Sequence, residues 1–169
     1  MMRGMRRTPP LGPALAFALA ATSAGPAAAL SCLAPDPARA FLAAQEAPER
    51  FVVVLGELSL EAPLGRVVSA DPSPGARSAP GRVRGEALAA DGRFASAFDA
   101  PVTVTATCAG PWCGGAAEGR QVLFLEVAEE GGYLLLAEPC GGRAFDAAPE
   151  VVGTISACMA GAGCRPGGY

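Results

Sequence analysis

The residues whose chemical role the sequence indicates most clearly are its six cysteines: Cys32, Cys108, Cys113, Cys140, Cys158 and Cys164. An even number of cysteines is typical of disulfide-bonded domains in oxidising compartments. Many pairings are open to six cysteines, and sequence spacing favours only short loops. A turn at Gly110-Pro111 can bring Cys108 next to Cys113. The flexible glycines at 161 and 163 allow Cys164 to fold back on Cys158.

A redox site is the first alternative to a structural role for these cysteines. The segment Pro111-Trp112-Cys113-Gly114-Gly115 is similar at first sight to the Trp-Cys-Gly-Pro-Cys site of thioredoxin-type enzymes. The second cysteine of such a site would stand at position 116, which is Ala116, and no helix is expected to follow. We therefore interpret CAGPWC as a short disulfide loop without redox activity.

A zinc site is the second alternative. Zinc-binding cysteines commonly occur in pairs with about two to four residues between them. Cys108 and Cys113 fit that spacing, whereas Cys158 and Cys164 are one residue too far apart. The sequence also contains no histidine, the commonest metal ligand. Disulfide bonds are therefore favoured, and we expect no bound metal and no cofactor.

Catalytic groups are scarce in the rest of the chain. Without histidine or lysine, no serine or threonine has the usual base to activate it. The adjacent carboxylates Glu129 and Glu130 stand in an expected turn, which favours a solvated charge cluster over an acid/base pair. Trp112, the single tryptophan, lies beside a cysteine and is expected to pack rather than to form a ligand platform. We therefore expect no catalytic residue and no enzyme activity.

The first 29 residues are typical of a secretory signal peptide. Arginines at positions 3, 6 and 7 precede a short apolar run at 14–21, and Ala27 and Ala29 match an Ala-x-Ala cleavage site. The alternative, a transmembrane anchor, needs about 20 apolar residues, more than this run provides. We predict that residues 1–29 are removed, that the mature chain begins at Leu30, and that residues 30–169 form one periplasmic or secreted domain without a membrane span.

The net charge of that domain limits the kinds of partner that it can bind. Cleavage would remove three arginines and no acidic residue, so the formal net charge would fall from −3 to −6. An acidic surface repels phosphate backbones, which argues against nucleic acid as a ligand. We expect a monomer whose partner is a protein or an envelope component.

The first half of the domain is predicted to contain one helix and one strong strand. Asp36 is a good N-cap and Pro37 a good first helical residue, for a helix that runs to Glu46. The apolar segment 51–60 (FVVVLGELSL) predicts a strand buried on both faces at first and on one face later, with a bend or bulge at Gly56. Residues 61–81 are rich in Pro, Gly and Ser and predict a long surface loop, with a short strand at 66–69 and no assigned role.

The second half is predicted to be mostly strands. Residues 82–90 and 101–108 predict two strands on either side of an Asp91-Gly92 turn, and residues 121–127 and 133–137 form a hairpin around a Gly-Gly turn. A final helix, capped by Asp146, is expected to end at Gly161. The order helix, about five strands, helix favours a mainly β, disulfide-stapled fold: a five-stranded OB-like barrel with a short N-terminal and a C-terminal helix. A β-sandwich is the alternative.

Two segments together resemble a known family. The first runs from Ser31-Cys32-Leu33 to Glu57, and the second is CAGPWC followed by VLFLEVAEEGGYLLLAEPCGGRAF. This order of an early cysteine, a helix, a strand reaching a glycine, and a late hairpin ending in Pro-Cys resembles netrin-like, or tissue-inhibitor-of-metalloproteinase-like (TIMP-like), OB-fold domains. The chain also resembles small secreted alphaproteobacterial proteins with a CAGPWCGG core.

The resemblance implies a fold, a disulfide and a class of function. It implies a five-stranded OB barrel and a disulfide between Cys32 and Cys140. These are the two cysteines that remain if Cys108 pairs with Cys113 and Cys158 pairs with Cys164. Animal members inhibit metalloproteases by placing the amine of an N-terminal cysteine on the catalytic zinc. Cleavage after Ala29 would leave Leu30 and Ser31 ahead of Cys32, so that amine would not be available here.

Two functional hypotheses follow from these observations. The first is an exported, non-enzymatic binding module, protein-binding or protease-inhibitor-like. The second is an envelope lipoprotein with a structural role, because Ala29-Leu30-Ser31-Cys32 partly matches the site at which a cysteine receives lipid.

Overall fold

The computed structural model describes residues 31–64 and 75–167. The expected signal peptide at 1–29 and the short strand at 66–69 lie outside these residues. The elements, in chain order, are α1 (Pro37–Glu46), β1 (Phe51–Leu60), β2 (Arg77–Leu88), β3 (Phe94–Ala106), β4 (Cys108–Ala109), β5 (Trp112–Cys113), β6 (Gly119–Val127), β7 (Tyr133–Ala137), β8 (Ala144–Asp146) and α2 (Pro149–Met159).

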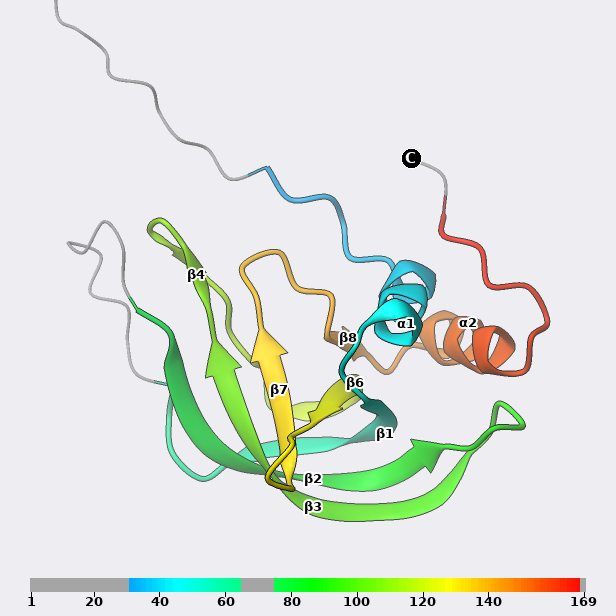
Figure 1. The fold of residues 1–169 in the computed structure, drawn as a ribbon, viewed down its shortest axis with the longest axis horizontal. Helices are drawn as coiled ribbons and strands as arrows, with labels where there is room; N and C mark the ends of the chain where they lie inside the picture. Colours follow the sequence, from blue (N-terminus) through cyan, green and yellow to red (C-terminus); the bar gives the residue numbers. More distant parts are fainter. Residues whose placement is uncertain (1–30, 65–74, 168–169) are drawn as a thin grey trace, which may run out of the picture.

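Five strands form a ring-like sheet, in the order β1-β2-β3-β7-β6, and β6 pairs back with β1 (Figure 1). All neighbours in the ring are antiparallel except β3 and β7, which are parallel. Strand β8 pairs with residues 121–123 of β6, on the edge opposite β1 and next to the segment that pairs with β7. Strands β4 and β5 form a separate small hairpin. The prediction of a mainly β domain with two helices is confirmed. Because the five strands belong to one sheet, the sandwich alternative is wrong.

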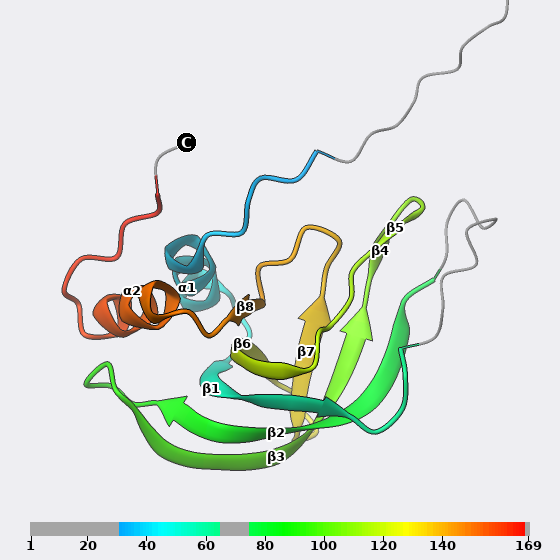
Figure 2. The same cartoon turned by 180° about the vertical axis from the view of Figure 1, so that it is seen from behind.

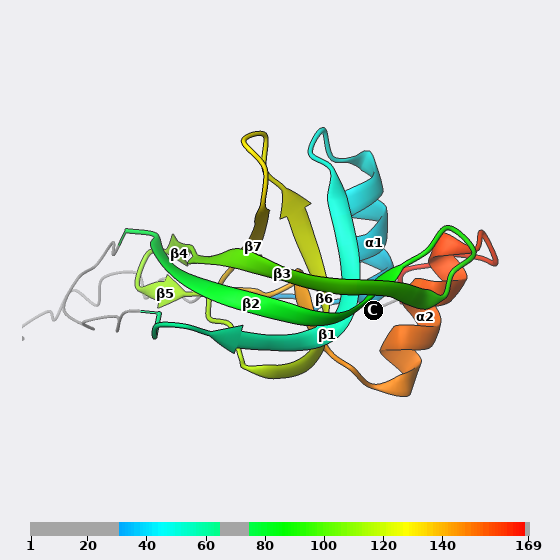
Figure 3. The ribbon, with the colours of Figure 1, turned by 90° about the horizontal axis from the view of Figure 1, so that it is seen from below.

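Strands β1 and β6 are buried on both faces, and this explains their long apolar runs. Alternate residues such as Val54 and Leu123 face the interior of the ring, where they join one hydrophobic cluster. The intervening Val53 and Phe124 face outward and join a second cluster with α1 and α2. Figure 3 shows both helices at one end of the sheet and the β4–β5 hairpin at the other. The expected change of β1 from two buried faces to one is confirmed, since its later residues Glu57 and Ser59 are exposed.

Glycines let β1 and β2 approach each other closely. Gly56 lies opposite Gly85, and a Cβ atom added at Gly85 would lie 2.2 Å from the carbonyl oxygen of Leu55. Of the bend or bulge expected at Gly56, the bulge is absent, because the residues of β1 pair with β2 without a register shift. Gly56 instead marks close contact between two backbones.

Three boundaries differ from the sequence predictions. Strand β2 begins at Arg77 rather than 82, because pairing with β3 draws the Pro- and Gly-rich residues 77–81 into the sheet. Asp146 belongs to the unexpected strand β8, and the N-cap of α2 is Ala148, which makes no side-chain capping bond. Strand β3 begins at Phe94, so the turn after Gly92 is shorter than expected. No helix among the described residues is long and apolar enough to cross a membrane.

Candidate functional site

Three disulfides hold the loops of the domain, and they are the pairs expected from the sequence: Cys32–Cys140, Cys108–Cys113 and Cys158–Cys164. The first joins the segment before α1 to the turn after β7 across 108 positions of sequence. The second closes the β4–β5 hairpin, and the third closes the turn after α2. All six cysteines are used, which fits an oxidising compartment such as the periplasm or the cell exterior.

The β4–β5 hairpin turns at Gly110, whose φ of 58° is a conformation that favours glycine. At its base, the Gly114 N–H donates to the carbonyl of Thr107 at 2.9 Å, and the Thr107 N–H donates to the carbonyl of Ala137 at 3.0 Å. A Cβ atom at Gly114 would collide with that Ala137 carbonyl. The hairpin is therefore seated directly on the end of β7.

The turn after β7 connects this hairpin to the N-terminal segment. Its Gly141 N–H donates to the Glu138 carbonyl at 3.0 Å, and Cys140 is bonded to Cys32. Gly141 also lies against the ring of Pro35. Residues 31–36, 108–113 and 138–142 thus form one connected surface, called the rim below, which projects from the same side of the sheet in Figures 1 and 2.

The rim carries the two exposed large apolar side chains of the described part of the chain. Leu33 is 67% exposed and Trp112 is 49% exposed. Each follows or precedes a disulfide-bonded cysteine, Cys32 and Cys113 respectively. Trp112, which was expected to pack beside its disulfide, is half exposed: its hairpin projects beyond the ring, and its cross-strand neighbour is the small, exposed Ala109.

A groove of about 270 Å³ lies on one flank of the rim, between residues 33–36, α1 and residues 138–143. Its walls combine the acidic side chains of Asp36 and Glu138 with the basic side chains of Arg39 and Arg143. A partner surface entering this groove would meet both signs of charge beside the apolar Leu33.

A wider depression of about 530 Å³ lies on the other flank, between the ends of β1 and β2 and residues 114–118. Arg77 lines it, and the Nε atom of this arginine is buried without a hydrogen-bond partner among the described residues. Its Nη2 atom lies 3.8 Å from the sulfur of Cys108. Glu118 also lines the depression, and its carboxylate accepts a hydrogen bond from the Leu60 N–H at 3.0 Å.

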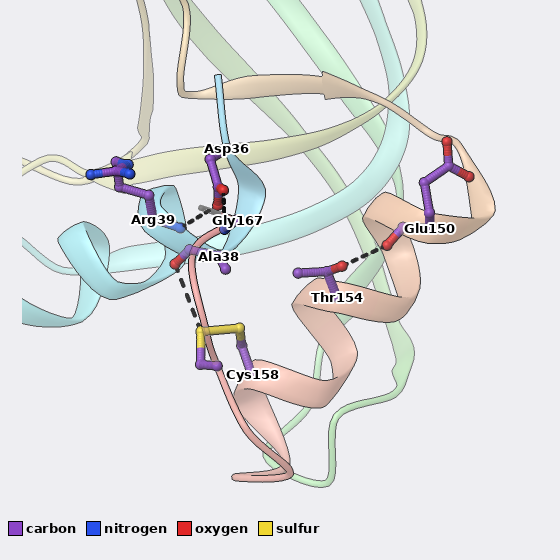
Figure 4. Close-up of a disulfide and its surroundings, with 8 residues drawn as sticks. Asp36, Ala38, Arg39, Glu150, Thr154, Cys158 and Gly167 are labelled. Carbon is purple, nitrogen blue, oxygen red and sulfur yellow. Dashed lines mark hydrogen bonds between the residues drawn. A yellow bond between two sulfur atoms is a disulfide. The ribbon is translucent and has the colours of Figure 1, made fainter. Parts of the chain in front are cut away.

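Asp36 links the start of α1 to the C-terminal segment at Gly167 through hydrogen bonds. Its carboxylate accepts hydrogen bonds from the Arg39 N–H at 2.9 Å and from the Gly167 N–H at 2.7 Å (Figure 4). The bond from Arg39 is the main reason that the pKa of Asp36 is lowered. The sulfur of Cys164 lies 3.7 Å from the Ala38 carbonyl, so the third disulfide also sits against α1.

The remaining sequence candidates do not gather into a site. Glu129 and Glu130 lie exposed in the β6–β7 turn, as expected. Within residues 31–64 and 75–167, no three acidic or cysteine side chains are grouped so that they could hold a metal ion. Gln121 was not predicted to be unusual, but it is only 7% exposed, and its amide oxygen has no hydrogen-bond partner in the part of the chain that the structure describes. Its place before the apolar run 122–125 is the only sequence signal for its burial.

No family model, no curated protein and no solved structure matches the chain. The functional argument therefore rests on the geometry of the rim.

Proposed function

We propose that this chain is an exported, non-enzymatic binding module that holds a protein partner against the rim. The observation that carries the proposal is the exposure of Leu33 and Trp112 on loops that disulfides attach to the sheet. Tryptophan is enriched among the residues that dominate protein-protein binding energy. Leu33 adds exposed apolar area elsewhere on the rim. Loops held in one conformation lose little entropy on binding.

We infer that the ring is a barrel of the OB type. The strand order, the closure of β6 on β1 and the parallel pairing of β3 with β7 support this inference. In such a barrel the loops around one end commonly provide the binding surface, and the rim is a set of loops of this kind.

The resemblance to TIMP-like domains makes a protease a suitable class of partner. The segment that begins at Cys32 would then enter the cleft of the protease with Leu33 as its leading apolar side chain. The test is inhibition of a panel of secreted metalloproteases and serine proteases. A Leu33→Asp variant should lose any inhibition found, whereas a Glu130→Ala variant should keep it.

The Cys32–Cys140 disulfide argues against the lipoprotein hypothesis. A lipoprotein carries its lipid on the sulfur of the modified cysteine, and this sulfur is bonded to Cys140 here. The intact mass of the natural protein distinguishes the two: we expect the mass of residues 30–169 with three disulfides and no lipid. The same measurement tests the predicted start at Leu30.

The experiment that tests binding is recovery of partners from the native periplasm or culture medium. Wild-type chain, a Leu33→Ser/Trp112→Ser variant and a Glu129→Ser/Glu130→Ser control are used as baits in parallel. We expect the same partner with wild-type and control baits and its loss with the rim variant. A partner that the rim variant recovers equally well would contradict the proposal.

A further inference from the structure

One disulfide of the rim has a positive charge beside it. The Nη2 atom of Arg77, the first residue of β2, donates a hydrogen bond to the sulfur of Cys108 at 3.8 Å. Figure 3 shows the start of β2 beside the β4–β5 hairpin that this sulfur closes. The Gly75 carbonyl oxygen lies 3.9 Å from the same sulfur, so the guanidinium is the nearer of these two neighbours and the charged one.

The guanidinium of Arg77 has few partners of its own. Its Nε atom is buried without a hydrogen-bond partner among the described residues, and the salt bridges found there do not include it. Glu118 lines the same depression, but its carboxylate accepts from the Leu60 N–H. A partly buried charge without a counter-ion is costly, so an anion formed at Cys108 would be stabilised. Such an anion forms when the disulfide is cleaved and Cys108 leaves as a thiolate.

The surroundings of the other two disulfides are different. Cys158 is 6% exposed within the helical core, and the sulfur of Cys164 lies against the Ala38 carbonyl oxygen rather than a cation. The Cys32–Cys140 bond closes 108 residues of chain, so the fold favours its oxidised form more strongly than that of the five-residue hairpin loop. The hairpin disulfide is therefore the one that should be reduced most easily.

Cleavage of this bond would release the hairpin and leave the ring of strands in place. Apart from the disulfide, the pairing of β4 with β5 comprises two residue pairs, Cys108–Cys113 and Ala109–Trp112. A two-stranded hairpin of this length is not stable by itself in water. The base of the hairpin is held separately, because the Thr107 N–H is bonded to the end of β7. Release would therefore affect Trp112 and its neighbours rather than the sheet.

We propose that the Cys108–Cys113 disulfide is a redox-sensitive switch, opened by a dithiol reductant and closed again by a disulfide oxidant. A thiolate of the reductant attacks the sulfur of Cys113, which is partly exposed, and forms a mixed disulfide while Cys108 leaves as a thiolate beside Arg77. The second thiol of the reductant then attacks its own sulfur in the mixed disulfide and releases Cys113.

This exchange is balanced in electrons and protons. The reductant loses two electrons and becomes a disulfide, and the chain gains the same two electrons. The two thiol protons of the reductant pass to water, and one proton is taken up by Cys113. Cys108 remains a thiolate paired with Arg77. Oxidation by a disulfide follows the reverse steps.

The proposed switch replaces the sequence-based interpretation of CAGPWC as a loop without redox activity. It differs from a thioredoxin-type site, because the chain here responds to a reductant and does not reduce a substrate. The sequence could not indicate this switch. Arg77 and Cys108 are 31 positions apart and meet because β2 pairs with β3 up to Ala106.

The order in which the three disulfides open tests the proposal on the unmodified chain. The folded protein is equilibrated in dithiothreitol buffers of rising reducing strength, alkylated and mapped by peptide mass. We expect alkylation of Cys108 and Cys113 while the other four cysteines are still bonded. Earlier opening of another disulfide, or opening of all three together, would overturn the proposal.

Substitutions at Arg77 test the part played by its charge. Arg77→Met should make the hairpin disulfide at least about tenfold harder to reduce, a shift of about 30 mV for a two-electron couple. Arg77→Lys keeps the charge and should shift the equilibrium less. Arg84→Met is the matched control, since it removes the same charge from the same strand where the side chain is 68% exposed and pairs with Asp99. Equal shifts in Arg77→Met and Arg84→Met would contradict the assigned role.

Release of the hairpin has its own readout in Trp112. Time-resolved fluorescence anisotropy should show faster local motion of this side chain after reduction and alkylation, while circular dichroism shows an unchanged sheet. Unchanged motion would overturn the release of the hairpin.

The effect of the switch on binding rests on the proposed function of the rim. The reduced and alkylated chain, used as bait in the native periplasm or culture medium, should recover less partner than the oxidised chain. Equal recovery would overturn control of binding by the switch. The reduction experiments need no partner, so failure of the switch and failure of the rim proposal are distinguishable.

Discussion

The rim and the helical end of the molecule are both held by disulfides, but the surroundings of those disulfides differ. At the helical end, Cys158 is buried in the same cluster as Phe41 and Ile155, so its cross-link adds to a packed core. At the rim, the disulfides lie beside Leu33 and Trp112, which are 67% and 49% exposed. The comparison indicates that apolar packing stabilises the helical end, whereas covalent bonds maintain the shape of the rim.

The largest expected effect comes from the long disulfide of the rim. In the chain-entropy model, closing 108 residues of chain contributes roughly 5 kcal/mol, and closing the five-residue loop of the hairpin contributes roughly 2 kcal/mol. A Cys32→Ser/Cys140→Ser variant should therefore lose far more free energy of unfolding than a Cys108→Ser/Cys113→Ser variant. Urea unfolding at neutral pH measures both. Equal losses would mean that the long cross-link does not restrain the unfolded chain.

At the helical end, packing should dominate. Phe41→Ala removes a side chain that is 2% exposed and should cost about 3–5 kcal/mol of unfolding free energy. Leu33→Ala at the rim should change that free energy by less than about 0.5 kcal/mol, because the side chain is exposed. Thermal unfolding of the two variants side by side measures the contrast. A comparable loss from Leu33→Ala would show that the rim is packed after all.

A smaller effect is expected at Asp36, where the two regions meet. Its pKa is lower in the folded chain than in the unfolded chain, so its stabilising contribution is present above about pH 4 and is lost as the pH falls through the folded-state pKa. Asp36→Asn keeps a capping oxygen and should remove this acid dependence. Asp36→Ala should also cost about 1 kcal/mol at neutral pH. Urea unfolding at pH 7 and pH 3 separates the two variants, and an unchanged acid dependence in Asp36→Asn would contradict the assignment.

The last prediction concerns the metal content of the purified chain, for which we expect no effect of the cysteines at all. The six cysteines are used by disulfides, so the purified chain should contain no stoichiometric zinc by elemental analysis. A chain that contains about one zinc atom would contradict the conclusion that disulfides maintain the shape of the rim, if a chelator removes this zinc and the rim then changes its conformation.

Elements with strong local signals were predictable from the sequence. Strand β1 has the expected bounds because its apolar run ends in turn-forming residues on both sides. The start of β2 was not predictable, because residues 77–81 have poor strand propensity and are held by their partners in β3. Strand β8 was missed because it has only three residues and depends on β6.

The candidate site was predictable in its bonds but not in its exposure. The cysteine pairs followed from turn residues, loop lengths and the family resemblance. The exposure of Trp112 depends on where the hairpin projects relative to the ring, and no local pattern specifies this.

Because Trp112 is the single tryptophan of the chain, its fluorescence reports on the rim directly. The central claim is that the rim contacts the partner, and the most direct test is acrylamide quenching of Trp112 before and after the recovered partner is added. We predict easy quenching in the free chain, and a blue-shifted emission with strongly reduced quenching in the complex. A saturated complex in which the emission and quenching of Trp112 are unchanged would contradict the claim.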